Sequence, residues 1–182
     1  WTSLRIPIIP SYDQYQPYYK YIHWSTYILV SVKWLIFWYN DNMHENFFLN
    51  LKVYYEDTDS GGVVYYANYL KFLERARTEA LFSIGFSNKK IQENYNSLII
   101  VKSCNIEYKK PAHLEDELKV RSFVKSITKT SFFMNQIITK DKEIVVEAQV
   151  HLVFVNKEGK PVKIPDEIYS KFKPYFCDSI KN

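Results

Sequence analysis

The residues from Asp57 to Tyr66 read Asp-Thr-Asp-Ser-Gly-Gly-Val-Val-Tyr-Tyr and have the composition of a reactive loop. A carboxylate, Asp59, lies two residues before Gly61 and Gly62 and a few residues before a predicted helix. A helix start offers unpaired N–H groups and partial positive charge to an oxyanion, while a nearby carboxylate attacks a carbonyl or activates water. The spacing therefore indicates acyl transfer. An aspartate before two glycines is also a common turn or N-cap residue, and that interpretation stays open.

A strand and a helix must hold this loop in place. Apolar residues alternate at Leu49, Leu51, Val53 and Tyr55, which predicts a half-buried strand over residues 49–55. Beyond the glycines, residues 65–84 carry apolar side chains at helical spacing, and Gly85 is placed to end the helix. The expected apolar face of this helix consists of Tyr69, Leu70, Phe72, Leu73, Ala76, Ala80 and Ile84.

The second half of the chain is rich in predicted strands. A short polar helix over residues 87–95 precedes strands over residues 98–108, 117–127, 131–139 and 143–155. In the last strand, the expected buried face consists of Ile144, Val146, Ala148, Val150, Leu152 and Phe154. Short connections predict an antiparallel meander covered by the long helix. The fold class is therefore α+β, with about five strands and one long helix, and its free edges favour dimers or larger assemblies.

Motifs around the reactive loop resemble a known enzyme family. Asp-Thr-Asp-x-Gly-Gly-Val-Val-Tyr, followed by Ala-Asn-Tyr and Phe72-Leu73-Glu74-Arg75-Ala76-Arg77-Thr78-Glu79, is similar to the 4-hydroxybenzoyl-CoA thioesterase family. Within it, the chain most resembles the bacterial acyl-CoA thioesterases associated with the Tol-Pal system. The likeness extends more loosely over residues 49–172 and includes Glu107-Tyr108-x-x-Pro111-Ala112 and Ser131-Phe132.

The resemblance implies a hot-dog fold, an antiparallel sheet wrapped around one central helix, assembled as homodimers or homotetramers with active sites at the dimer interface. It implies hydrolysis of an acyl-CoA thioester to a free carboxylic acid and CoA, without a metal or redox cofactor. By position, Asp59 becomes the catalytic carboxylate, either as nucleophile or as general base on water. The backbone N–H of Tyr66, with Gly62 and Val63 nearby, becomes the oxyanion and substrate-binding site. Many relatives have histidine at the position of Tyr66, so any proton transfer specific to histidine is lost here.

Glu74 is the alternative catalytic carboxylate. Another branch of hot-dog thioesterases uses a carboxylate on the central helix, which is where Glu74 lies. The structural interpretation is that Glu74 pairs with Arg77 or Thr78 one turn further on. Arg75 and Arg77 are themselves most simply interfacial or solvated.

Three further residues are candidates for contacts with the substrate. Lys129 lies near the position where relatives contact the CoA phosphates, although a lone lysine in a turn is commonly only solvated. Tyr65 and Tyr69 can line an acyl pocket, but aromatic residues at helical spacing commonly belong to the core.

Two other classes of function stay open. A hot-dog module can bind acyl-CoA, acyl-carrier protein or an envelope-biogenesis partner without catalysis, because function resides in the site and not in the fold. The intact loop around Asp59 favours an enzyme. A dehydratase acting on hydroxyacyl thioesters is disfavoured, since the paired histidine and carboxylate of that chemistry are not evident.

The overall composition excludes several classes of protein. The 182 residues are 47% hydrophobic and 24% charged, which is typical of one globular domain. The net charge of +4 is spread without a long basic run, so a nucleic-acid partner is not expected. The 2 cysteines and 4 histidines are scattered, which indicates a reduced cytoplasmic protein without a metal site. Peripheral contact with the inner membrane stays open.

Residues 1–42 differ from the rest, because they hold all 4 tryptophans and few charged residues. Their most apolar stretch is interrupted by Lys33 and is shorter than the ~20 residues of a membrane-spanning helix, so no transmembrane span is expected. We expect Met43 to be the initiator, which makes residues 1–42 an over-extended gene model. The alternative is a real extension that lies on a membrane surface or a partner. The thioesterase domain is then predicted over residues 43–175, with a C-terminal tail at 176–182.

Overall fold

The structure, a computed structural model, describes residues 46–176. Its elements are β1 (Phe47–Lys52), the 3-10 helix η2 (Tyr55–Asp57), α2 (Asn68–Ser83), α3 (Asn88–Tyr95), β2 (Leu98–Tyr108), β3 (Glu117–Ile127), β4 (Ser131–Lys140), β5 (Glu143–Val155), α4 (Asp166–Phe172) and the 3-10 helix η3 (Lys173–Tyr175). None of the helices in this part of the chain is long and apolar enough to cross a membrane. The predictions for Met43, for residues 1–42 and for most of the C-terminal tail lie outside the described residues.

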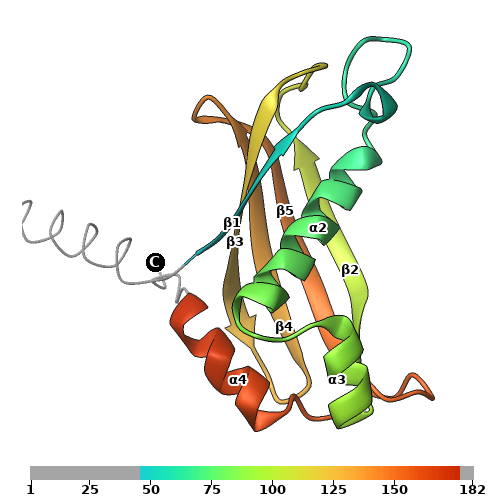
Figure 1. The fold of residues 1–182 in the computed structure, drawn as a ribbon, viewed down its shortest axis with the longest axis vertical. Coiled ribbons are helices and arrows are strands. Elements are labelled where there is room, and N and C mark those ends of the chain that lie inside the picture. Colours follow the sequence, from blue (N-terminus) through green and yellow to red (C-terminus); the bar gives the residue numbers. More distant parts are fainter. Residues whose placement is uncertain (1–45, 177–182) are drawn as a thin grey trace, which may run out of the picture. The chain divides into compact units, whose positions relative to one another are not determined.

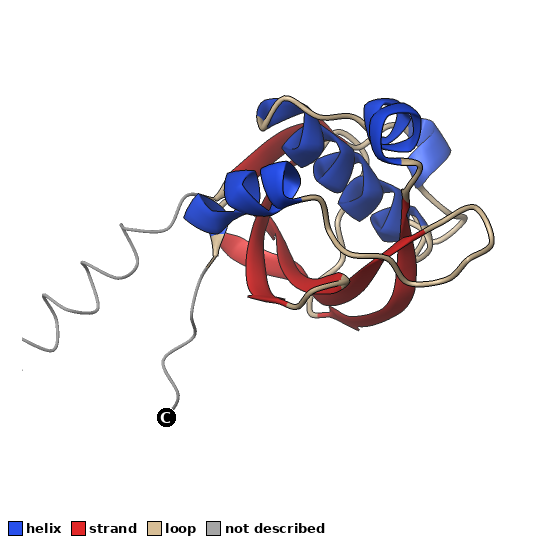
Figure 2. Ribbon diagram, turned by 90° about the horizontal axis from the view of Figure 1, so that it is seen from below, coloured by secondary structure: helices blue, strands red, loops and turns tan. Residues whose placement is uncertain are grey.

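The five strands form one antiparallel sheet in the order β1-β3-β4-β5-β2. Strands β3, β4 and β5 form the predicted meander, with Val120 opposite Ile138 and Ile138 opposite Val146. Strands β1 and β2 lie at the two edges, and α2 crosses the sheet diagonally (Figure 1). The helices gather on one face of the sheet (Figure 2). This arrangement is the hot-dog fold that the resemblance implied.

The core between α2 and the sheet divides into two clusters along the helix. The first half of α2 contributes Tyr69, Phe72, Leu73 and Ala76, which pack with Val53, Val64, Ala112, Leu118, Val120, Ile138, Val145, Val146 and Ala148. The second half contributes Ala80 and Leu81, which share a cluster with buried residues of α3, α4 and the other ends of the strands. The loop that contains Asp59 therefore rests on the first cluster.

Strand β1 ends earlier than predicted. It stops at Lys52, and Tyr55, expected on the buried face, is 81% exposed in η2. The Asp57 side chain explains the difference, because its Oδ2 accepts the Tyr54 N–H at 2.9 Å and folds the chain into a 3-10 turn. Val53 remains buried as expected.

Helix α2 begins later than predicted, at Asn68. Tyr65 N–H donates to Asp57 O at 2.9 Å, and Asn68 Nδ2 donates to the same oxygen at 3.0 Å, so the chain is held in a turn before the helix. Leu70, expected in the core, is 44% exposed. The helix ends before Gly85, whose φ of 90° suits glycine, as the sequence predicts.

Two features at the C-terminal side differ from expectation. Ile144 is 39% exposed while Val145 and Val146 are both buried, because the β4–β5 pairing shifts register beside Thr139. Such a bulge changes which side chains face the core. Helix α4 was not predicted, and its buried Ile168 closes the lower end of the second cluster.

Candidate active site

Asp59 lies in a short hairpin between η2 and α2, and this segment of the chain is at the upper end of the view in Figure 1. The two sides of the hairpin pair through Tyr65 N–H to Asp57 O and Asp59 N–H to Val63 O, each at 2.9 Å. Gly62 N–H donates back to Asp59 O at 3.0 Å and closes the turn. Gly62 has a φ of 75°, where other residues are strained, so the turn depends on this glycine.

The Asp59 carboxylate is held by one of its two oxygens. Oδ1 accepts the Gly61 N–H at 2.7 Å. Oδ2 accepts no hydrogen bond from residues 46–176, and the side chain is exposed. A Cβ at Gly61 would lie 3.0 Å from Oδ1, so the absence of a side chain there lets the carboxylate adopt this position. One carboxylate oxygen is therefore fixed, and the other is free to act on a ligand or water.

The hairpin is tied to the domain through Val64 and Tyr69. Val64 N–H donates to Ala112 O at 2.8 Å, and Ala112 N–H donates to the Tyr69 hydroxyl at 3.1 Å. Tyr69 is 3% exposed, and burial raises the pKa of its hydroxyl. Tyr69 therefore has the structural role that its helical spacing suggested. Asp57 is structural as well, since it is buried and its carboxylate forms the Tyr54 contact.

Tyr66 presents its backbone N–H just before α2. This N–H donates to no acceptor within residues 46–176, whereas the Gly62 N–H is already engaged in the turn. The Tyr66 carbonyl accepts the Tyr108 hydroxyl at 3.3 Å, and the two rings meet edge to face at 6.5 Å. Tyr108 had no assigned role in the sequence prediction, and its only signal was its place in the Glu107-Tyr108 motif. Its contact helps to fix the orientation of the Tyr66 peptide.

Tyr65 directly precedes Tyr66 at the end of the hairpin. Its ring is 42% exposed and lies 4.7 Å from the Tyr66 ring. The hydrogen bond with Tyr66 raises the pKa of the Tyr65 hydroxyl, and the negative charge of Asp59 adds to the rise. Tyr65 therefore keeps its proton near neutral pH.

The structure does not bring Glu74 or Lys129 to Asp59 within one chain. Glu74 lies further along α2, where its Oε1 accepts the Thr78 hydroxyl at 2.7 Å, one of the two partners expected for it. Lys129 follows the end of β3 that is remote from the hairpin. The 11 residues of β3 span roughly 36 Å at 3.3 Å per residue. Lys129 and Asp59 therefore lie at opposite ends of the sheet within one chain.

Comparison with known proteins decides the family. The sequence profile of the thioesterase-like superfamily matches residues 53–172. The chain belongs to this superfamily. The acyl-CoA thioester hydrolase YbgC of Escherichia coli is 38% identical over 125 residues, which cover 68% of this chain and 92% of that protein. The acyl-CoA thioesterase YbgC of Haemophilus influenzae is 35% identical over 131 residues, or 71% of this chain and 96% of that protein.

A solved structure supports the same superfamily. The probable thioesterase from Bartonella henselae has a TM-score of 0.65 to this chain and is 32% identical to it. The match covers 66% of this chain and 100% of that chain. The resemblance predicted from the motif is thus confirmed for the thioesterase family and for the fold. The roles assigned to individual residues remain predictions.

Proposed function

We propose that this protein hydrolyses acyl-CoA thioesters to a free carboxylic acid and CoA, with Asp59 as the catalytic carboxylate. The observation that carries the proposal is the exposed Asp59 carboxylate, which Gly61 holds through Oδ1, in a turn that leads directly to the Tyr66 N–H. Within residues 46–176, Asp59 Oδ2 has no hydrogen-bond donor and the Tyr66 N–H has no acceptor. Membership of the superfamily supports the class of reaction, because relatives in Escherichia coli and Haemophilus influenzae are named acyl-CoA thioester hydrolase and acyl-CoA thioesterase.

Two routes use the same groups. In both, the thioester carbonyl oxygen accepts the Tyr66 N–H, and the positive end of α2 stabilises the negative charge that develops on this oxygen. In the first route, Asp59 Oδ2 attacks the carbonyl carbon, the C–S bond breaks, CoA leaves as the thiolate, and water then hydrolyses the mixed anhydride. In the second route, Asp59 takes a proton from water as that water attacks the carbonyl carbon, and the C–S bond then breaks so that CoA leaves as the thiolate.

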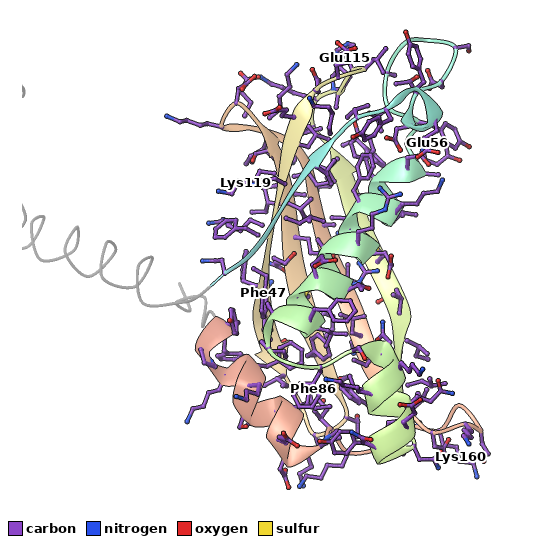
Figure 3. All side chains as sticks on the ribbon, viewed as in Figure 1. Phe47, Glu56, Phe86, Glu115, Lys119 and Lys160 are labelled. Atoms are coloured by element: carbon purple, nitrogen blue, oxygen red, sulfur yellow. The ribbon has the colours of Figure 1, made fainter. Side chains whose placement is uncertain are left out.

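A thiol-release assay over acyl-CoAs of graded chain length tests the proposal. Asp59→Asn is expected to lower kcat/KM by about 100-fold or more, the range seen for loss of a general base. Glu56→Gln is the matched control, because Glu56 is an exposed carboxylate in η2, directly before the hairpin (Figure 3). Its activity should stay within about twofold of the native protein. Glu74→Gln should also retain most of the activity.

The same assay separates the alternatives. Loss of activity in Glu74→Gln with retention in Asp59→Asn would transfer the catalytic role to Glu74. Absence of thiol release from every acyl-CoA, with binding retained, would favour the module that binds acyl-CoA or acyl-carrier protein without catalysis. A cytoplasmic location, contact with the inner membrane and an acyl-carrier protein partner remain predictions from the sequence.

We further propose that the protein forms a homodimer along β2. This edge strand is exposed from residue 100 to residue 105, with Ile100 43% and Val101 48% exposed. Exposed apolar edge strands are uncommon in monomers because they pair with other chains. If Lys129 contacts the CoA phosphates, as the resemblance implies, its distance from Asp59 in one chain places that lysine on a second copy.

Light scattering during size-exclusion chromatography tests the dimer. Ile100→Asp should give a monomer, since a charge on an apolar interface disfavours association. Ile144→Asp is the matched control, because Ile144 is 39% exposed and lies at the start of β5, whereas Ile100 pairs with Val153 near the other end of that strand. A monomeric native protein at micromolar concentration, or identical behaviour of the two variants, would contradict pairing through β2.

A further inference from the structure

Asn68 is a buried polar residue at the start of α2, two residues after Tyr66. It is 5% exposed, although asparagine commonly lies at the surface. Its Nδ2 donates to Asp57 O at 3.0 Å and, more weakly, to Glu56 O at 3.4 Å. Figure 3 shows Glu56 beside the start of the helix. The side chain therefore points back to η2 and fastens the helix to the segment that precedes the Asp59 hairpin.

This contact is not a helix cap. An asparagine at a helix start commonly accepts a backbone N–H through its side-chain oxygen. Within residues 46–176, Asn68 Oδ1 accepts no hydrogen bond, and both neighbours of the amide nitrogen are carbonyl oxygens. Only the donor end of the amide can satisfy these two acceptors. A carboxylate of the same shape could not replace the amide, because an ionised carboxylate accepts hydrogen bonds and donates none.

The backbone N–H of Asn68 sets the direction of the Tyr66 N–H. It donates to Tyr65 O at 2.8 Å and closes a turn with Tyr66 and Ala67 at its centre. Tyr65 O and the Tyr66 N–H belong to one peptide unit, which is planar and trans, so they point in opposite directions. Because Tyr65 O points into the turn, the Tyr66 N–H points out of it. This geometry explains why the Tyr66 N–H has no acceptor within residues 46–176.

The two contacts of Asn68 meet at Tyr65. Asp57 O, which accepts Asn68 Nδ2, also accepts the Tyr65 N–H at 2.9 Å. A carbonyl oxygen has two lone pairs, so it can accept both donors at once. The Tyr65 N–H pairs across the base of the Asp59 hairpin, while its carbonyl pairs with the Asn68 backbone. The catalytic carboxylate and the oxyanion donor are therefore both tied to one asparagine.

We propose that Asn68 is a positioning residue for hydrolysis at Asp59, an inference that rests on the proposed function. Its side-chain amide acts through the Asp57 carbonyl to hold the Tyr66 N–H in a fixed direction relative to the catalytic carboxylate. An oxyanion donor stabilises the transition state only if it already points to where the oxyanion forms. Without the side-chain amide, the Asn68 backbone still closes the turn, but the turn is no longer held to η2. Loss of the amide should therefore lower kcat and leave KM nearly unchanged.

Steady-state thiol release from one acyl-CoA tests the inference. Loss of an oxyanion donor costs about 100- to 1000-fold in kcat, so its misdirection should cost less. Asn68→Asp presents a carboxylate to two carbonyl oxygens and should lower kcat about 10- to 100-fold. Asn68→Ala only removes the donor and should lower kcat about three- to tenfold. Both variants should keep KM within about twofold of the native value.

Ser97→Ala is the matched control. Ser97 is 4% exposed, and its hydroxyl donates to Tyr95 O at 2.8 Å at the end of α3. The substitution removes a bond from a buried side chain to a backbone carbonyl, as Asn68→Ala does, but far from the Asp59 hairpin in the sequence. The kcat of Ser97→Ala should stay within about twofold of the native value, even if its stability falls as much as that of Asn68→Ala.

A pH profile gives a readout that loss of stability alone would not produce. Protonation of the carboxyl introduced by Asn68→Asp restores one O–H donor, and burial favours the protonated form. The deficit in kcat relative to the native protein at the same pH should therefore shrink as the pH falls from about 8 to about 5. Asn68→Ala introduces no titratable group, so its deficit should stay constant over this range. Asn68→Ala also carries the test if Asn68→Asp does not fold.

The direction of the Tyr66 N–H is measured without substrate from its resonance in a proton–nitrogen correlation spectrum of the full chain. Both Asn68 substitutions should shift this resonance, and Ser97→Ala should leave it in place. Native kcat in both Asn68 variants, or an equal loss in Ser97→Ala, would overturn the inference. If the native protein hydrolyses no acyl-CoA, the proposed function fails and the spectrum alone decides the positioning. A Tyr66 resonance that moves in neither Asn68 variant would then overturn it.

Discussion

Replacing Gly61 by alanine should separate the position of the Asp59 carboxylate from the stability of the fold. The backbone of Gly61 does not have a positive φ, so alanine is compatible with its conformation. The added Cβ would lie 3.0 Å from Asp59 Oδ1, closer than an ordinary van der Waals contact. Asp59 is exposed, so its side chain can give way and the rest of the hairpin can stay in place.

The size of the effect follows from this contact. Relief of the contact requires a shift of a few tenths of an ångström in the carboxylate. A misplacement of about 1 Å in a reacting group can cost about 100-fold, so a shift of roughly 0.3 Å corresponds to about a fourfold loss if the logarithm of the rate scales with distance. We therefore expect Gly61→Ala to lower kcat/KM by about three- to tenfold. Its free energy of unfolding should change by less than about 0.5 kcal/mol, as for most surface substitutions.

Gly62→Ala is the matched comparison, because the same methyl group is added one residue further on. No atom lies within 4 Å of its Cβ position, but the φ of 75° strains alanine. This variant should lose about 1–2 kcal/mol of stability, the cost of a left-handed conformation for a residue with a Cβ. The measurements are urea denaturation and thiol release from one acyl-CoA, followed over substrate concentrations at which the rate saturates. An unchanged kcat/KM in Gly61→Ala, with the fold intact, would refute the assignment of Asp59 to the reaction.

Three other substitutions test the packing and the polar contacts. Phe132→Ala should cost about 3–5 kcal/mol in urea denaturation, since Phe132 is 2% exposed in the core. Tyr108→Phe removes the hydrogen bond to Tyr66 O and should lower kcat/KM about threefold, with a stability change below about 1 kcal/mol. Burial by itself would raise the pKa of the Asp116 carboxyl. Hydrogen bonds from Lys140 and from the His113 N–H outweigh burial, so the pKa is lowered. A lowered carboxyl pKa contributes stability above the unfolded value near 3.9, lost as the pH falls through the folded value. Asp116→Asn should therefore cost about 1 kcal/mol at pH 7, and the deficit should shrink as the pH falls below about 4 and vanish below the folded pKa of Asp116.

The strands were predictable wherever a regular alternation ends in turn residues. The predicted spans 98–108, 117–127 and 143–155 coincide with β2, β3 and β5, because apolar alternation and flanking turns are both local in the sequence. The end of β1 and the start of α2 were not predictable in the same way. Both depend on Asp57, whose side chain and carbonyl oxygen capture donors on either side of the hairpin. A hydrophobic pattern carries no information about such contacts.

The features of the candidate site also differ in how far they could be predicted from the local sequence. The turn after Asp59 was predictable, because an aspartate before two glycines favours this geometry within four residues. The positions of Tyr108 and Arg77 were not. Each is set by a partner far away in the sequence, Tyr66 for one and Gln136 for the other. Residue type alone left Arg77 as a solvated or interfacial side chain, while the fold pairs it with a buried glutamine.

The two interpretations of Asp59 that the sequence left open, turn residue and catalyst, are compatible. The turn uses Asp59 O and Oδ1, which accept from Gly62 and Gly61, and it leaves Oδ2 without a partner in the described residues. Because the turn uses only one of the two carboxylate oxygens, it restricts the rotation of the side chain and fixes the direction of Oδ2. The amide of Asp59→Asn retains an Oδ1 acceptor for Gly61 while removing the negative charge. A loss of activity in that variant with unchanged stability therefore reports the chemistry of the carboxylate and not the collapse of the turn.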